Sequence, residues 1–135
     1  MPLRKVRGSR SLLVTVMSEL PCATRKASVA MAGTSPDNPE WIRRKSNCVR
    51  RFNKPSYALT LRQTKSGKGF APDDAVDPME IAAHGGSFPI RIEGVSVVGT
   101  ITVSGVPGRR DHGYVVEAIC EHLGIDYAPL ALPPE

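Results

Sequence analysis

SFPIRIEGVSVVGTITVS, at residues 87–104, is the segment of this chain whose pattern indicates a structure most clearly. Apolar and polar residues alternate in residues 87–93 and again in residues 95–104, and a period of two predicts strands with one apolar and one more polar face. Glu93-Gly94 between the two runs is typical of a tight turn, so we expect an antiparallel hairpin. Pro89 lacks an N–H, which predicts that its strand lies at an edge or carries a bulge.

A strong helix is expected before the hairpin, where Asn38 can act as the N-cap and Pro39 suits the first helical position. Pro55 is expected to end this helix. Apolar residues at helical spacing predict one buried stripe, which consists of Trp41, Cys48, Val49 and Phe52. The arginines that lie mostly off the stripe are expected in solvent; they are Arg43, Arg44, Arg50 and Arg51.

A second strong helix is expected after the hairpin. Asp111 is the expected cap, since its charge suits the positive end of a helix, and Gly124 is the expected stop. The side expected to be buried contains Val115, Val116, Ile119, Cys120 and Leu123. Cys48 and Cys120 both fall on apolar helix faces, where a cysteine usually acts as a small hydrophobic residue.

Weaker signals mark the remaining elements. Residues 11–17 are apolar and β-branched and predict a strand, and residues 26–32 are a weaker strand candidate. Residues 56–63 alternate like a strand, although Pro55-Ser56 is equally able to open a short helix. Asp77-Pro78 predicts another short helix that stops at Gly85-Gly86, and residues 126–135 are expected to be extended.

Composition limits the class of protein. With 135 residues, 41% hydrophobic and 23% charged, the chain fits one globular domain and argues against wholesale disorder. No apolar run approaches the ~18 residues of a membrane span. The three cysteines are odd in number and lack a C-x-x-C spacing, which excludes a recognisable disulfide framework or zinc knuckle and fits reduced thiols in the cytoplasm.

Positive charge is concentrated in the first part of the chain. Residues 1–51 carry eleven Lys and Arg against three Asp and Glu, whereas the whole chain has a net charge of +5. Such a segment can attract phosphates, but the seven aromatic residues do not interleave with it, so nucleic-acid binding is not expected and a solvated basic face is favoured. The basic start before residues 12–17 is similar to a signal peptide or a mitochondrial presequence, although a mobile or strand-forming start is the preferred interpretation.

Two histidines stand at the two ends of the hairpin. His84 precedes Gly85-Gly86 before the first strand, and His112 follows the loop after the second. If the strands pair, both imidazoles lie toward one end of the sheet, where they can ligate iron or shuttle protons. The alternative is two surface histidines that bond to backbone groups, because no third ligand has a recognisable spacing.

An anion site is a further hypothesis at the second helix. Ser104 leaves the strand into a loop that precedes the helix N-terminus, where free N–H groups lie beside Arg109 and Arg110. Asp111 would oppose an anion there, and a plain strand–loop–helix connection is the simpler interpretation.

Several spaced blocks together resemble one known family. They are Asp37-Asn38-x-x-Trp41-Ile42-x-x-Lys45, then HGGSFPIR from His84, VGTITVSG from Val98, and Asp111-His112. In this order, over about residues 27–125, they are similar to the haem-degrading-domain family, which includes HbpS, the GlcG-like proteins and an uncharacterised "UPF" branch. The last of these is the most similar.

The resemblance implies an α+β fold of one domain, a profilin-like or PAS-like antiparallel β-sheet flanked by helices, usually assembled into a homo-oligomer. It implies a helix at residues 56–63, and we follow it there. It divides the chain into an atypical basic N-terminal segment at residues 1–25, the HbpS-like domain at residues 26–126 and an extended tail at residues 127–135.

The resemblance also implies function. Haem is the expected cofactor, and haem binding, with oxidative haem breakdown in some members, is the expected activity of a cytoplasmic protein. The residues expected to bind it are His84, Gly85, Gly86, Ser104, Arg109, Arg110 and His112, with no separate metal site because the family's E-x-x-E iron-binding carboxylates are absent. The alternatives are a non-enzymatic homo-oligomeric adaptor with a chaperone partner in tail-anchored protein delivery, and a GlcG-like domain that binds a small acid.

Overall fold

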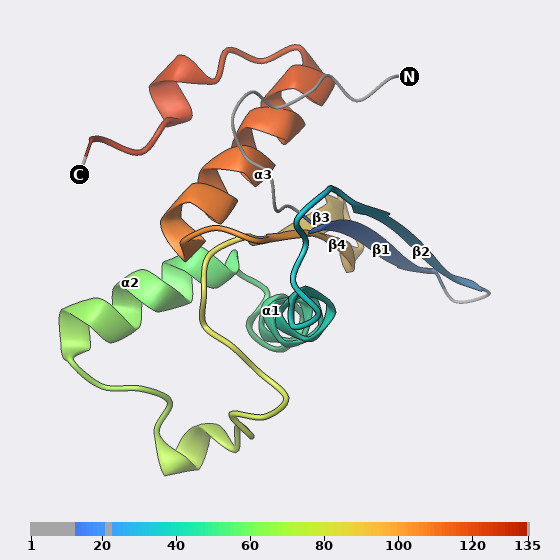
Figure 1. Cartoon of the computed structure of the whole chain (residues 1–135). Coiled ribbons are helices and arrows are strands. Elements are labelled where there is room, and N and C mark those ends of the chain that lie inside the picture. Colours follow the sequence, from blue (N-terminus) through green and yellow to red (C-terminus); the bar gives the residue numbers. More distant parts are fainter. Residues whose placement is uncertain (1–12, 21–22, 135) are drawn as a thin grey trace.

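The computed structural model describes residues 13–20 and 23–134, and side chains from residue 28 to residue 134. Four antiparallel strands form one sheet in the order β2-β1-β4-β3, and Figure 1 shows α1 and α3 on opposite sides of it. The strands are β1 (Leu13–Leu20), β2 (Ala23–Ala30), β3 (Ser87–Ile92) and β4 (Ser96–Ser104). The helices are α1 (Asn38–Phe52), α2 (Ser56–Ser66) and α3 (Gly108–Leu123), with short 3₁₀ turns at Pro72–Asp74 and Ala128–Leu130. The expected α+β class is confirmed.

The hairpin formed by β3 and β4 is confirmed. Phe88 pairs with Ile101, and the chain turns at Gly94, whose φ of 75° is one that glycine adopts without strain. Pro89 lies on β3, which is an edge strand, and the register shifts between Ile90 and Arg91. Both expectations drawn from this proline are therefore met, since an edge position leaves its missing N–H without consequence.

β1 lies at the centre of the sheet, between β2 and β4. It pairs with β4 from Leu13 opposite Ser104 to Ser18 opposite Gly99. The strand expected at residues 11–17 is confirmed from residue 13 onward, whereas residues 11 and 12 lie outside the described residues. The strand expected at residues 26–32 is found as β2, which begins and ends a few residues earlier.

The start of α1 differs from the expectation. Asp37 takes the N-cap position without a side-chain cap bond, and Asn38 is already helical. Asn38 cannot cap because its amide turns to the sheet, where Nδ2 donates to the Ser104 carbonyl oxygen at 3.4 Å. On the expected stripe, Cys48 and Val49 are fully buried.

α2 is a helix, as the resemblance implied and against the alternation of its sequence. Ser56 and Leu59, three residues apart, are buried together on one side. Leu61 would share the apolar face of a strand with Leu59, yet its side chain is 51% exposed. The strand-like alternation of apolar and polar residues in residues 56–63 therefore does not match the pattern of burial in α2.

The helix expected at Asp77-Pro78 is wrong, because the chain makes only a single turn there. The N–H groups of Glu80 and Ile81 both donate to the Asp77 carbonyl oxygen. A longer helix would need the next carbonyl groups, but side chains of α1 bind them. Arg44 donates to the Pro78 carbonyl, Arg43 to the Met79 carbonyl and Asn47 to the Glu80 carbonyl. Both arginines therefore hold this segment in addition to reaching solvent, so the expected solvated face is correct only in part; Arg51 is exposed as expected.

α3 begins at Gly108 after the N-cap Pro107, so the expectation that Asp111 caps it is wrong. Asp111 lies in the first turns of the helix and is fully buried against an ion partner described below. The stop at Gly124 is confirmed by its left-handed backbone. Leu123, expected on the buried side, is 60% exposed because it lies a turn beyond the apolar cluster of Val115 and Ile119. The tail is not wholly extended, since it contains the 3₁₀ turn Ala128–Leu130.

The two faces of the β3–β4 hairpin differ in chemistry. Toward α3, Val103 and Val115 form an apolar cluster with Phe88 and Ile101 packed on it. Toward α1, the alternate residues of the strands are hydroxyl side chains, because successive residues of a strand point to opposite faces. Thr102 Oγ1 lies 2.9 Å from Ser46 Oγ and 2.8 Å from Ser87 Oγ. The layer between α1 and the sheet is therefore a hydrogen-bonded polar layer.

Within the described residues, no helix has the length and apolar character needed to cross a membrane. Cys48 and Cys120 are free thiols and both are buried, which agrees with their expected role as small hydrophobic residues. Burial raises the pKa of Cys48 to about 12, so this thiol is held in its unreactive protonated form.

Candidate functional site

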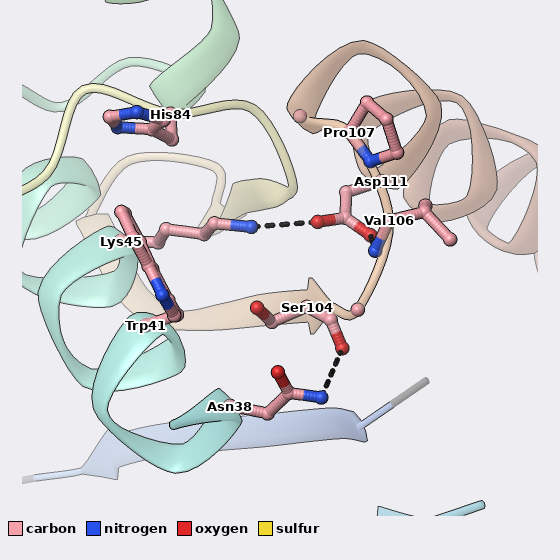
Figure 2. Close-up of a pocket in the computed structure, with 10 residues that line it drawn as sticks. Asn38, Trp41, Lys45, His84, Ser104, Val106, Pro107 and Asp111 are labelled. Carbon is pink, nitrogen blue, oxygen red and sulfur yellow. Dashed lines mark hydrogen bonds and ion pairs between the residues drawn. The ribbon is translucent and has the colours of Figure 1, made fainter. Parts of the chain in front are cut away.

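A cavity of about 340 Å³ lies where α1, the His84 loop and the connection from β4 to α3 meet (Figure 2). Its lining consists of Asn38, Trp41, Lys45, His84, Ser104, Gly105, Val106, Pro107, Gly108 and Asp111. The volume is at the lower end of the roughly 300–1,000 Å³ typical of small-molecule sites. Since α1, β4 and α3 all contribute, the packing of the fold builds the cavity.

The floor of the cavity is a buried ion pair between α1 and α3. Lys45 Nζ lies 2.8 Å from Asp111 Oδ2 and donates a second hydrogen bond to the Val103 carbonyl oxygen at 3.2 Å. Lys45 is 3% exposed and Asp111 is 0% exposed. The Val106 N–H donates to Asp111 Oδ1 at 3.2 Å, and the Gly105 amide also bonds to this carboxylate.

Burial opposes the charges of this pair. It raises the pKa of Asp111 and lowers the pKa of Lys45, although the opposite charge of each partner works in the other direction. The backbone amides around Asp111 also favour its ionised form. A pair of this kind contributes little net stability relative to apolar residues, but it penalises strongly the loss of either partner.

The rim of the cavity carries an aromatic and an imidazole ring. The rings of Trp41 and His84 meet edge to face with centroids 4.9 Å apart, and the Arg44 guanidinium lies 4.9 Å from the Trp41 ring centre. Burial lowers the pKa of His84 below 6.5, and the positive charges of Lys45 and Arg44 lower it further. The exposed imidazole is therefore mainly neutral at pH 7, with a lone pair available to a metal ion.

Two glycines bring the His84 loop against the rest of the site. A Cβ on Gly85 would lie less than 3.0 Å from the Gly108 carbonyl oxygen, and one on Gly86 would do the same to the Val103 carbonyl oxygen. Gly86 also has a φ of 119°, and its carbonyl accepts the Val103 N–H at 2.7 Å. Any side chain at either position would push the loop, and with it His84, away from the cavity.

The structure does not bring His112 into this cavity. Its ring stacks on Tyr57 with centroids 4.8 Å apart and lies 6.4 Å from the Phe88 ring, toward the apolar side of the hairpin. Burial lowers the pKa of His112 below 6.5. Its Nδ1 atom is buried and has no hydrogen-bond partner among the described residues. The two histidines therefore do not form a joint site.

Arg109 and Arg110 face a different surface. Arg109 donates to the Tyr57 hydroxyl at 3.2 Å and to the Pro133 carbonyl, and Arg110 donates to the Tyr114 hydroxyl at 3.3 Å. Both line a second cavity of about 270 Å³ under the C-terminal segment. Of the residues expected from the sequence, His84 and Ser104 line the first cavity. Gly85 and Gly86 follow His84 in its loop and are not part of the lining.

Sequence reasoning missed Lys45 and Asp111 as partners, and it did not single out Asn38 and Trp41 as site residues. The sequence contains one indication of this ion pair, which is the position of Lys45. Lys45 lies three residues after Ile42 and four before Val49, on the face that packs against the sheet. A lysine on a buried helix face requires an opposite charge, and Asp111 is the one acidic residue that is fully buried among the described residues.

The polar groups of the cavity are a side-chain amide, a hydroxyl and an ion pair of ammonium and carboxylate, with an imidazole at the rim. No group of three or more His, Cys, Asp or Glu side chains able to hold a metal ion occurs in the part of the chain that the structure describes. A metal that brings most of its own ligands, as in a porphyrin, needs only one such side chain.

Comparisons with known proteins agree with the resemblance. The model of the family described as "Haem degrading protein HbpS-like" matches residues 10–120. A UPF0303 protein of Burkholderia orbicola strain MC0-3 is 50% identical over 103 residues, which cover 76% of this chain and 62% of that protein. A UPF0303 protein of Brucella canis is 50% identical over 104 residues, which cover 77% of this chain and 62% of that protein. The chain thus spans less than two thirds of the length of these curated relatives.

Two solved structures share the fold. The crystal structure of the Ybr137w protein matches with a TM-score of 0.58 and 26% identity, over 74% of this chain and 58% of that chain. The crystal structure of HbpS matches with a TM-score of 0.62 and 24% identity, over 85% of this chain and 75% of that chain. These likenesses support the single-domain α+β architecture.

Proposed function

Because this chain belongs to the family of HbpS-like haem-degrading proteins, we propose that it binds haem at the cavity between α1 and the start of α3, with His84 as the side chain that meets the iron. The observation that supports this assignment most is the imidazole of His84, which is exposed at the rim of the cavity beside the Trp41 ring. A neutral imidazole is a common axial ligand of haem iron.

The residues of the cavity fit what haem requires. His84 offers a nitrogen ligand, Trp41 offers an aromatic surface beside it, and Lys45 offers a cation at the floor. The cavity of about 340 Å³ suits one edge of a large planar ligand. His112 is not assigned as a ligand in this proposal, since its ring is stacked on Tyr57 outside the cavity.

The chain's own residues would bind and orient the group. Haem, when bound, supplies the redox chemistry toward oxygen. Trp41 keeps the His84 ring edge-on, while the hydrogen bonds from Arg43, Arg44 and Asn47 to residues 78–80 hold the loop that leads to it. Oxidative haem breakdown, self-association, a chaperone partner and a cytoplasmic location are implied by the resemblance and stay predictions.

A hemin titration of the purified protein tests this proposal. We expect a saturable shift of the Soret band at one equivalent. We expect His84→Ala to weaken binding by at least about tenfold, because even the loss of a group that only orients a metal ligand typically costs about 10–100-fold in affinity. His122→Ala is the matched control, because His122 is an exposed histidine in the last turn of α3 and outside the cavity. A wild-type protein that gives no saturable shift, or a His84→Ala variant that binds like the control, would refute the assignment.

A further inference from the structure

We propose that Lys45 and Asn38 form a carboxylate-binding subsite in this cavity, which takes a haem propionate or the carboxylate of a free organic acid. As far as the propionate is concerned, this inference rests on the proposed function. It assigns the acid group to the α1 side of the cavity, whereas the sequence pointed to Arg109 and Arg110, which bond to Tyr57, Pro133 and Tyr114 elsewhere.

Lys45 has a hydrogen-bond donor to spare. An ammonium group has three N–H groups, and among the described residues only Asp111 Oδ2 and the Val103 carbonyl oxygen accept from it. Asp111 has less capacity left, since the amides of Gly105 and Val106 also bond to its carboxylate. The pair is close to neutral as a whole, and the third N–H of Lys45 is the one that remains for a ligand.

Asn38 adds a second donor from the same helix. This residue is 6% exposed and lines the cavity, and the one hydrogen bond that its side chain makes within the described residues is long, from Nδ2 to the Ser104 carbonyl oxygen at 3.4 Å. A side-chain amide carries two N–H groups, so one remains for a ligand. Asn38 and Lys45 are seven residues apart, which places them on one face of α1 two turns apart, and Figure 2 shows both beside the same opening.

Trp41 lies between these two residues in the sequence and lines the same cavity. Its ring gives the subsite an aromatic surface, so the arrangement favours a carboxylate attached to a flat apolar body.

The first arm of the test uses the wild-type protein and compares hemin with hemin dimethyl ester by the Soret shift. The ester keeps the iron and the macrocycle but loses both carboxylates. Since the ester cannot form the charge-assisted hydrogen bonds of a carboxylate, we expect it to bind at least about tenfold more weakly. Equal affinities for hemin and its ester would exclude the propionate as the group bound, and would leave the iron assignment intact.

The second arm tests a free acid without haem. Trp41 is the only tryptophan of the chain, so its emission reports directly on the cavity. Benzoate is expected to change this emission saturably if free acids enter, whereas benzamide, which has the same shape and no charge, is expected to change it at least about tenfold more weakly. This arm decides between the two sources of the carboxylate even if hemin does not bind at all.

A matched pair of variants assigns the effect to the subsite. Asn38→Asp replaces a donor by a negative charge and should weaken hemin or benzoate but not the ester or the amide. Gln63→Glu makes the same amide-to-carboxylate change on α2, outside the cavity, and should weaken none of them. The subsite is overturned if hemin and its ester bind alike and benzoate has no effect, or if the two variants behave alike. Absence of hemin binding with benzoate binding retained would refute the proposed function and keep the subsite.

Discussion

Replacing Lys45 by Met would leave Asp111 as a buried charge without its cation. The side chains of the pair are 4% and 1% exposed, and the two charged atoms are 2.8 Å apart. Methionine keeps most of the length of the side chain, so the change removes the charge and little packing. Removing one partner of a buried pair costs about 3–5 kcal/mol, a large part of the roughly 5–15 kcal/mol that stabilises a domain of this kind. The folding equilibrium constant is therefore expected to fall by a factor on the order of 10²–10⁴.

Urea unfolding followed by circular dichroism at pH 7 measures this loss. A double-mutant cycle with Asp111→Leu separates the interaction from packing, and we expect the double variant to recover most of the loss because two apolar residues can replace a buried pair. Arg62→Met is the control, since its ion pair with Asp74 lies at the surface and contributes little. A single variant as stable as the wild type, or a double variant that recovers nothing, would refute the role given to the pair.

Three further changes have defined outcomes. Burial lowers the pKa of His112 below 6.5, so the unfolded chain binds more protons than the native chain as the pH falls below 6.5, and the free energy of unfolding must decrease there. His112→Phe should make the free energy of unfolding, measured by urea titration, depend less on pH in this range. An unchanged pH dependence would contradict the burial of His112. Gly85→Ala should lower the free energy of unfolding by about 1–3 kcal/mol, because the added Cβ would overlap the Gly108 carbonyl oxygen. Gly69→Ala, which has open space around it, should lower it far less. Equal melting temperatures of the two variants would contradict the close packing at Gly85. Cys48, with a pKa of about 12, should resist alkylation by iodoacetamide in the native state at pH 8 and react only after unfolding. Peptide mass spectrometry measures the modified fraction, and rapid alkylation of the native protein would contradict the burial of Cys48.

Elements defined by local patterns were predictable from the sequence. The hairpin is confirmed because alternation, a Glu93-Gly94 turn and an edge proline all indicate the same structure. α1 and the end of α3 at Gly124 are confirmed for the same reason, since helical spacing and a left-handed glycine are local signals.

The errors occur where a partner distant in the sequence competes with a local preference. Asn38 and Asp111 are both good N-caps by residue type, but the end of β4 binds one and Lys45 binds the other. The turn after Asp77 stays short because α1 side chains bind its carbonyl groups. Such partners cannot be identified from the spacing of residues in one segment.

The candidate site was predictable in part. His84 and Ser104 were expected at the end of the hairpin, and both line the cavity. His112 was expected beside His84 because both flank the hairpin, but periodicity does not tell which side of α3 faces the cavity, and His112 stacks on Tyr57 instead. The buried Lys45 was the signal with the most information about the site, because a charge on a packed helix face requires a partner.

Paramagnetic broadening of backbone amide signals by one equivalent of ferric haem tests the place of binding most directly. In a ¹H–¹⁵N correlation spectrum, we expect the signals of residues 84–86, 104–106 and 108 to disappear first, because these residues surround the cavity beside His84. Signals of residues 113–117, 127–128 and 130–132, around the second cavity, should persist at the same stoichiometry. Broadening centred on that second cavity, or no selective broadening at all, would contradict haem binding at the cavity beside His84.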